Sequence, residues 1–161
     1  MPKPICLRPH TVSIAAPREL VFQMMSHFGR GRLSGDNNES SRVIERDGDR
    51  LMVEFVTETP VCTYTTIEEV RLYPPERITF NHLSGPLRYV SEEFTLEEVD
   101  ARHTDLTHSG EFVWRDVPLY GWLGGILYIR PVFERTMVKH MAQIKQAAEA
   151  RAARSRVFPR A

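Results

Sequence analysis

Two histidines, His82 and His108, occur in stretches where every second residue is apolar. Side chains at alternate positions of a strand point to the same face, so both imidazoles are expected to face the protein interior. A neutral imidazole there can exchange a hydrogen bond with a carbonyl or a phenol, and it can act as an acid or a base. The alternative is a core histidine satisfied by a neighbouring group, or a histidine at a strand end in water.

Other polar residues of the same stretches could orient a ligand. Tyr64 and Tyr89 carry phenols suited to the polar end of a small molecule, although tyrosine is also common in strands for its packing alone. Glu92 and Glu93 are consecutive, so in a strand their carboxylates point to opposite faces and form no catalytic pair. The inward one is expected to be a buried acid with a raised pKa, and the sequence does not say which of the two it is.

The sequence shows no arrangement of residues suited to a catalytic triad, a metal site or a cofactor site. Asp105, His108 and Ser109 have the residue types of a catalytic triad, but on one strand His108 faces away from the other two. The histidines show no metal-ligand spacing on a common face, and no cofactor is expected. Cys6 and Cys62 have no CxxC spacing, which indicates two buried or idle thiols rather than a disulfide or a zinc site.

The central part of the chain alternates in the manner of strands joined by short turns. Short connections between consecutive strands predict an antiparallel meander. A first strand is expected at residues 11–15, a helix opening at Pro17 over residues 18–27, and a loop or a short irregular helix at residues 29–38. The later strands are expected at residues 41–46, 50–56, 63–72, 77–83, 87–99 and 104–114.

The last third of the chain changes to helical periodicity. From Leu119 to Ala148 the apolar residues recur at helical spacing and fall on one broad stripe, which predicts a helix of roughly nine turns. Pro131 is expected to kink or split this helix. Arg130 and His140 fall near the stripe, so each should either pair or face a wet cavity, unless it reaches solvent from the margin.

Composition limits the classes of function. The 161 residues suit one domain, with the core at about residues 11–151 and a tail at 152–161. Basic and acidic residues number 21 each, so bulk charge draws the protein to neither nucleic acid nor membranes. No signal peptide and no membrane span are apparent, and a soluble cytoplasmic protein is expected.

Three stretches resemble the START-related superfamily (SRPBCC), which includes birch-pollen-allergen-like proteins, polyketide cyclases and aromatases, and coenzyme Q-binding proteins. They are residues 12–22 (VSIAAPRELVF), 119–135 (LYGWLGGILYIRPVFER) and 141–149 (MAQIKQAAE). The resemblance implies an α+β helix-grip fold, in which a curved antiparallel sheet of about seven strands wraps a long C-terminal helix around an apolar cavity. Only Asp47-Gly48-Asp49 stands where plant-type members carry a glycine-rich loop, so no function of that loop is transferred.

The expected function is binding of a hydrophobic small molecule, such as a lipid, an isoprenoid quinone or a polyketide-like compound. One alternative is an enzyme of the cyclase or dehydratase type, in which His82, His108 or an inward acid moves a proton. Another is a macromolecular interaction module, for which the arginine-bearing tail is the supporting feature. Neither the oligomeric state nor the ligand follows from the sequence, and no nucleic-acid partner is expected. The residues expected to line the cavity are Tyr64, Phe80, His82, Tyr89, His108, Phe112, Trp114, Trp122, Ile126, Ile129, Phe133 and Met137.

Overall fold

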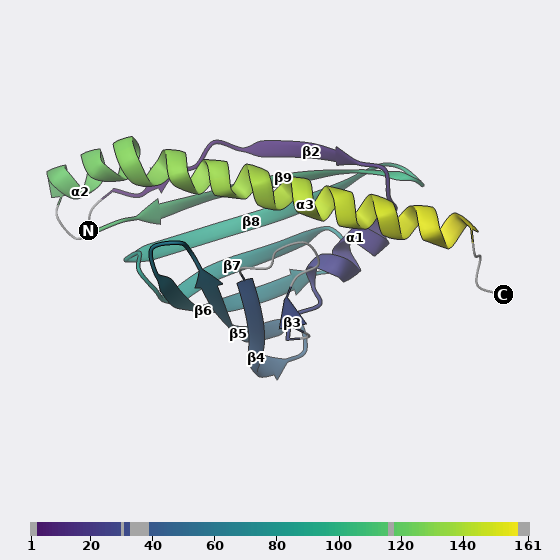
Figure 1. Ribbon diagram of the computed structural model, residues 1–161, viewed down its shortest axis with the longest axis horizontal. Helices are drawn as coiled ribbons and strands as arrows, with labels where there is room; N and C mark the ends of the chain where they lie inside the picture. The colour runs from purple at the N-terminus through teal and green to yellow at the C-terminus, as the bar shows by residue number, and fades with distance from the viewer. Residues whose placement is uncertain (1–2, 30, 33–38, 116–117, 158–161) are drawn as a thin grey trace.

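One curved sheet and one long helical rod dominate the computed structural model, which describes residues 3–29, 31–32, 39–115 and 118–157 (Figure 1). The strands are β1 (Ile5–Cys6), β2 (His10–Ile14), β3 (Gly31–Arg32), β4 (Glu39–Asp47), β5 (Arg50–Glu58), β6 (Thr63–Tyr73), β7 (Arg77–Ser84), β8 (Tyr89–Asp100) and β9 (His103–Val113). The helices are α1 (Arg18–Met25), α2 (Pro118–Gly124), the π-helical η1 (Gly125–Ile129) and α3 (Arg130–Val157).

The sheet is antiparallel throughout and has nine strands among the described residues. Its order is β1-β9-β8-β7-β6-β5-β4-β3, and β2 also pairs with β9, so the two N-terminal strands share one partner. The meander and the long helix confirm the predicted α+β helix-grip fold. Two strands more than expected appear because β1 and β3 are only two residues long, too short for the alternation of apolar residues to mark them.

The elements α2, η1 and α3 follow one another without a gap and form the C-terminal helical rod, which continues through Pro131 instead of splitting there. Pro131 is the second residue of α3, and a proline has no backbone N–H to donate to the preceding turn. The π-helical turn η1 lies immediately before α3, and the backbone N–H of Arg130 donates to the carbonyl oxygen of Gly125 across this turn. The helix also continues to Val157, and Ala152 is buried, so ordered structure extends beyond residue 151.

Two apolar clusters join the rod to the concave face of the sheet. The larger cluster packs α1 and the sheet against the later part of α3, where Met141 and Ala148 are fully buried. The smaller cluster is centred on Phe112 and gathers η1 and the beginning of α3 over β1, β8 and β9. Figure 1 shows the rod running along β2 and β9 while β3 to β6 curve away from it.

The convex face of the sheet carries charged side chains that pair with one another. Arg50 pairs with Glu69 at 2.7 Å, and Arg77 pairs with Glu93 at 3.5 Å, all on this outer face. Opposite charges at neighbouring positions of adjacent strands suit a solvated face. None of the described helices is long and apolar enough to cross a membrane.

Candidate functional site

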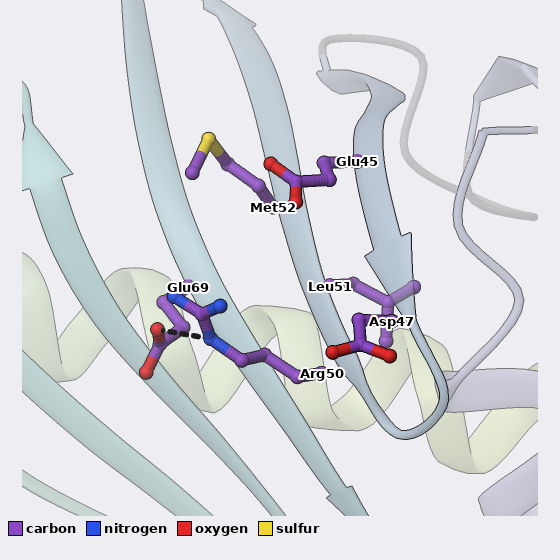
Figure 2. Close-up of a pocket in the computed structure, with 6 residues that line it drawn as sticks. All are labelled: Glu45, Asp47, Arg50, Leu51, Met52 and Glu69. Carbon is purple, nitrogen blue, oxygen red and sulfur yellow. Dashed lines mark hydrogen bonds and ion pairs between the residues drawn. The ribbon is translucent and has the colours of Figure 1, made fainter.

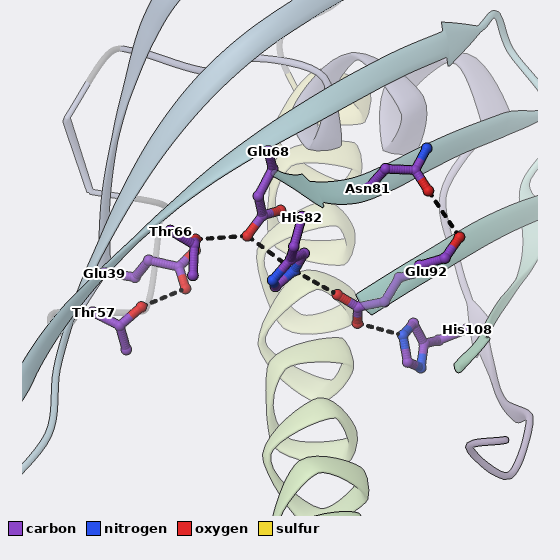
Figure 3. A network of polar contacts seen from close by, with 9 residues as sticks. Glu39, Thr57, Thr66, Glu68, Asn81, His82, Glu92 and His108 are labelled. Atoms are coloured by element: carbon purple, nitrogen blue, oxygen red, sulfur yellow. Dashed lines mark hydrogen bonds and ion pairs between the residues drawn. The ribbon is translucent and has the colours of Figure 1, made fainter. Parts of the chain in front are cut away.

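Four ionisable side chains form a continuous polar chain on the concave face of the sheet (Figure 3). His82 Nε2 lies 3.1 Å from Glu68 Oε1 and 3.4 Å from Glu92 Oε2. The other oxygen of Glu92 lies 2.9 Å from His108 Nε2. At the far end, the Thr66 hydroxyl donates to Glu68 Oε1 at 2.7 Å. We call Glu68, His82, Glu92 and His108 the buried quartet.

Strand register explains why these four side chains meet. They come from the adjacent strands β6, β7, β8 and β9, one from each, and Glu68 stands directly opposite His82. Glu92 stands opposite Gly110, where a Cβ atom would lie 2.7 Å from the Ser91 carbonyl oxygen and 3.2 Å from Glu92 Cγ. Glycine therefore leaves the room that the Glu92 side chain occupies.

Burial and hydrogen bonding set the charges of the quartet. Burial would raise the pKa of Glu92, but hydrogen bonds from His108 and His82 outweigh it and lower this pKa from 4.5 to about 2. Burial would lower the pKa of His82, yet the neighbouring Glu92 and Glu68 raise it. The pKa of Glu68 is raised because burial outweighs the opposing effects of His82 and Thr66. The quartet thus combines an ionised carboxylate, Glu92, with a histidine that favours its protonated form.

The state of Glu92 determines the tautomer of His108. An ionised carboxylate can only accept hydrogen bonds, so the Nε2 atom of His108 that contacts it must carry a proton. A neutral His108 then keeps Nδ1 as an unprotonated acceptor, which is the form that a general base requires. A carboxylate that orients a histidine in this way is a recurrent catalytic arrangement.

His108 also lines a pocket of about 260 Å³ between the sheet and the helical rod. The pocket lies between the two apolar clusters, where neither fills the space beneath α3. Its volume is close to the lower end of the range for small-molecule sites, about 300 Å³. Its lining residues are Arg8, Pro9, His10, His108, Glu134, Met137 and Val138.

The polar groups of this pocket come from three separate segments. His10 of β2 is the cross-strand partner of His108, so both side chains point to the same face. Glu134 accepts hydrogen bonds from the backbone N–H of Arg8 at 2.8 Å and from Arg130 Nε at 2.9 Å. Burial would raise the pKa of Glu134, but these donors lower it, so the carboxylate is ionised and engaged.

Aromatic rings continue the concave face away from His108. The ring of Phe94 lies 4.9 Å from the imidazole of His108, and the Phe80 ring lies 5.8 Å from that of Phe94. Phe28 and Phe55 extend the series with edge-to-face contacts. These rings belong to the larger apolar cluster or pack against it, so they form the part of the core that lies beside the quartet.

The predicted lining residues fall into several groups in the structure. Near the pocket or the quartet lie Phe80, His82, His108 and Met137. Tyr64 is 36% exposed, on the same face of β6 as Glu68, and burial raises the pKa of its phenol. Packed in the smaller apolar cluster are Phe112, Trp114, Ile126, Ile129 and Phe133.

Two predicted residues lie away from this interior. Tyr89 is on the convex face, 39% exposed, and its hydroxyl donates to Glu111 Oε1 at 3.0 Å. It occupies an odd position of β8, whereas the buried side chains of that strand occupy even positions. Trp122 is 38% exposed on α2, where Gly121 and Gly124 are the residues that pack closely against Arg115 and Trp114. A ligand-lining role is therefore not supported for Tyr89 or Trp122.

Sequence reasoning missed several members of the site and one charge state. Glu92 is the inward acid, but its pKa is lowered, not raised as expected, because two histidines from neighbouring strands surround it. Glu68 was overlooked, although its even spacing from the apolar Val70 places it on the inner face. His10 and Glu134 have no such local signal, since each reaches the pocket only through tertiary packing. Cys6 and Cys62 are both exposed and free, so they are not the buried thiols considered from sequence.

A second hollow, on the outer surface, is too small to be a ligand site. Figure 2 shows this shallow depression on the β4–β5 hairpin and β6, where Arg50 pairs with Glu69. It offers about 10 Å³, enough for about one water molecule. Among the described residues, no group of three or more His, Cys, Asp or Glu side chains is placed to hold a metal ion.

Comparison with known proteins identifies the fold. No protein-family model matches the chain, and no curated protein sequence matches it. Solved structures do. The Zhui aromatase/cyclase from Streptomyces sp. R1128 superposes with a TM-score of 0.70 at 21% identity, covering 95% of this chain and 96% of that one. The chain has the START-related (SRPBCC) fold.

Other members of this fold class align over similar lengths. A START superfamily protein from Mycobacterium smegmatis gives a TM-score of 0.67 at 16% identity, over 93% of this chain and 99% of that one. The protein Ara h 8.0201 gives 0.61 at 15% identity, over 94% and 99%. Identities this low establish the START-related fold and carry no specific activity with them.

Proposed function

We propose that the protein binds a hydrophobic small molecule between the concave face of the sheet and α3. The observation that carries the proposal is the 260 Å³ pocket beside His108, flanked by apolar clusters on both sides. Apolar walls with a few convergent polar groups are typical of small-molecule sites. The similarity in fold to START and aromatase/cyclase proteins supports this class of function.

The chemistry of the lining restricts the kind of ligand. Pro9, Met137 and Val138 give the pocket apolar walls, which favour an apolar body. His10 and His108 favour a carbonyl or a phenol, which imidazoles can recognise by hydrogen bonding. Glu134 is ionised, so a strongly anionic group next to it would be repelled. A lipid, an isoprenoid quinone or a polyketide-like molecule meets these requirements.

The direct test is native mass spectrometry of the protein purified from its own host, followed by organic extraction. Blocking the pocket provides a second readout, with the uncharged dye N-phenyl-1-naphthylamine as the probe, because the ionised Glu134 would repel an anionic dye. Val138 lines the pocket and is 43% exposed, so Val138→Trp can fill the mouth without disturbing the core. We expect the variant to weaken dye binding about tenfold, because the indole occupies the space that the probe needs.

The matched control is Ile44→Trp. Ile44 is 45% exposed on β4 and is not among the residues that line the pocket, so the added indole should leave dye binding unchanged. Equal loss of binding in both variants, or no loss in either, would contradict binding at this pocket. A co-purifying lipid, quinone or polyketide would identify the ligand class directly.

A second candidate function is an enzyme of the cyclase or dehydratase type. The specific observation that favours it is the contact of 2.9 Å between the ionised Glu92 and His108, with His108 also lining the pocket. Neutral His108 could take a proton from a carbon next to a carbonyl group, and the resulting imidazolium could give that proton to a hydroxyl on the adjacent carbon, which would leave as water while the carbon–carbon double bond forms. The aromatase/cyclase among the similar folds agrees with this chemistry.

Replacing His108 with glutamine tests for turnover. If the protein is an enzyme, His108→Gln should retain an unconverted molecule that differs from the wild-type ligand by the elements of water, because the base is gone. The measurement is mass spectrometry of extracts from the wild type and the two variants, all expressed in the same host. His103→Gln is the control, since His103 is exposed and bonded to Asp100. The same molecule in all three extracts would leave binding as the function.

A further inference from the structure

The imidazole of His108 uses only one of its two nitrogens within the protein. Its Nε2 atom lies 2.9 Å from Glu92 Oε1, the contact at one end of the polar chain in Figure 3. Its Nδ1 atom has no hydrogen bond to any of the described residues, although His108 is only 2% exposed. Such an atom is uncommon in a folded protein, because a buried polar group without a partner costs free energy.

The unpartnered Nδ1 atom opens into the pocket. Within the part of the chain that the structure describes, Arg18 Nε is the one fully buried side-chain nitrogen or oxygen that lacks a hydrogen-bond partner. Nδ1 of His108 lacks a partner as well, so it is not fully buried. His108 lines the pocket of about 260 Å³, which is the open space next to its ring. A ligand in the pocket can therefore reach Nδ1.

The contacts of Glu92 make this Nδ1 atom a hydrogen-bond acceptor. Each carboxylate oxygen of Glu92 meets one imidazole nitrogen, Oε1 that of His108 and Oε2 that of His82. An ionised carboxylate between two imidazoles satisfies both contacts only if each histidine donates an N–H to it. A neutral His108 has one N–H, and Glu92 takes it. Nδ1 can then accept a hydrogen bond but cannot donate one.

Glu134 adds a second acceptor to the same pocket. Its Oε1 atom accepts hydrogen bonds from the backbone N–H of Arg8 and from Arg130 Nε, at 2.8 and 2.9 Å. The described residues place no donor on its other oxygen, Oε2. The side chain of Arg8 is a donor but is exposed, and His10 can act in either role. The groups that are fixed as acceptors and still lack a partner are thus His108 Nδ1 and Glu134 Oε2.

We propose that the pocket selects a ligand that donates a hydrogen bond, such as a phenol, an enol or a hydroquinone, over one that offers only a carbonyl or ether oxygen. The ligand hydroxyl meets His108 Nδ1, and Glu92 is the positioning residue, because it holds the other ring nitrogen. This inference rests on the proposed binding function and narrows it. Of the two groups that an imidazole can recognise, this imidazole favours the hydroxyl, since a ligand without a donor leaves Nδ1 unsatisfied.

Competition between matched probes tests the preference. 1-Naphthol and 1-methoxynaphthalene share a compact bicyclic ring, and only the naphthol has a hydroxyl to donate. Each is used to displace N-phenyl-1-naphthylamine from the wild-type protein at pH 8, well above the pKa of about 6.5 of a free histidine side chain. We expect 1-naphthol to compete about tenfold more effectively than the ether. Naphthalene, which is smaller and also has no donor, should compete as weakly as the ether, so that the size of the methyl group is controlled. Equal competition by all three would overturn the proposal.

Glu92→Gln tests the positioning role. A glutamine side chain offers both an N–H and a carbonyl, so it no longer forces the proton of His108 onto Nε2. The preference for 1-naphthol over 1-methoxynaphthalene should fall from about tenfold to about threefold or less. A merely structural role would weaken both probes and leave their ratio unchanged. Glu93→Gln is the matched control, since Glu93 pairs with Arg77 on the convex face, and it should keep the wild-type ratio. An unchanged ratio in Glu92→Gln, or the same loss in both variants, would contradict the role of Glu92.

Long-range ¹H–¹⁵N NMR spectra of the unliganded wild type identify the tautomer of His108 without any variant. We expect the proton on Nε2 and none on Nδ1, and a proton on Nδ1 would overturn the proposal. If the dye binds in the pocket but the matched probes compete equally, binding of a hydrophobic molecule stands and the preference fails. If the dye does not bind, or Val138→Trp does not weaken it, the proposed function itself fails. The two failures therefore give different results.

Discussion

Glu92→Ala is expected to lower the free energy of unfolding by about 3–5 kcal/mol, the usual cost of removing one partner from a buried ion pair. Glu92 is buried, and it contacts two histidines at 2.9 and 3.4 Å. Without it, His108 loses its hydrogen-bond acceptor, and His82 keeps only the Glu68 contact. Release of the proton by His82 limits the cost, because a neutral imidazole is cheaper to bury than a charged one. Urea denaturation of both proteins at neutral pH measures the difference.

The neighbouring Glu93 provides a control of the same residue type on the same strand. Glu93 points to the convex face, where it is paired with Arg77 at 3.5 Å and both side chains are more than a third exposed. Exposed pairs of this kind contribute at most about 1 kcal/mol, so Glu93→Ala should change stability little. Similar losses for Glu92→Ala and Glu93→Ala would show that the buried quartet is not ionised as described.

The pH dependence of stability is the second large expected effect. The pKa of Glu92 is lowered from 4.5 to about 2 in the folded protein, so its ionised form stabilises the fold above pH 4.5. That contribution, worth roughly 3 kcal/mol, is lost as the pH falls toward 2. His82 has the opposite effect on the pH dependence of stability. Its pKa is raised above 6.5, so its contribution is complete below pH 6.5 and is lost as the pH rises through the raised value.

Glu68 offsets part of the stability that is lost when Glu92 is protonated at low pH. Its raised pKa means that the folded protein holds this proton more tightly, so its contribution is complete below pH 4.5 and is lost on raising the pH. Together the three shifts predict greatest stability between about pH 5 and 6, from this quartet. Denaturation curves from pH 2 to neutral provide the measurement.

The difference between wild type and Glu92→Gln isolates the quartet from other carboxylates. Glu134 and Glu149 also have lowered pKa values and contribute to acid unfolding in both proteins. The stability gap should be largest near pH 6 and should shrink toward zero as the pH approaches 2, because protonated Glu92 resembles glutamine in charge. A gap that does not change with pH would contradict a lowered pKa at Glu92.

The balance between binding and catalysis depends on the same two residues. A ligand carbonyl or phenol that meets His108 could be held there without reaction, with Glu92 keeping the imidazole in one tautomer. The same geometry would let His108 move a proton if a substrate presents one. The extracts of His108→Gln distinguish the two, since binding alone predicts no chemical change in the retained molecule.

Local sequence patterns by themselves predict most of the fold. The alternation around His82 and His108 indicates strands with inward imidazoles, and the structure places both on the concave face. The helical period after Leu119 marks the rod. These patterns are readable because a strand repeats every two residues and a helix every 3.6, whatever the rest of the chain does. The resemblance to the START-related superfamily points to the same architecture, which the solved structures confirm.

Only the tertiary structure determines the charge states of the site residues and which residues lie next to one another. The inward one of Glu92 and Glu93 was expected to be an acid of raised pKa, and only the register of β7, β8 and β9 shows that this is Glu92 and brings two histidines to it. His10 and Glu134 meet His108 across 98 and 26 residues of sequence, through strand pairing and the position of α3. Trp122 is 38% exposed because Gly121 and Gly124, not the tryptophan, pack closely against Arg115 and Trp114. Pairing partners, electrostatic fields and close contacts are properties of three-dimensional distance, and local periodicity carries no information about them.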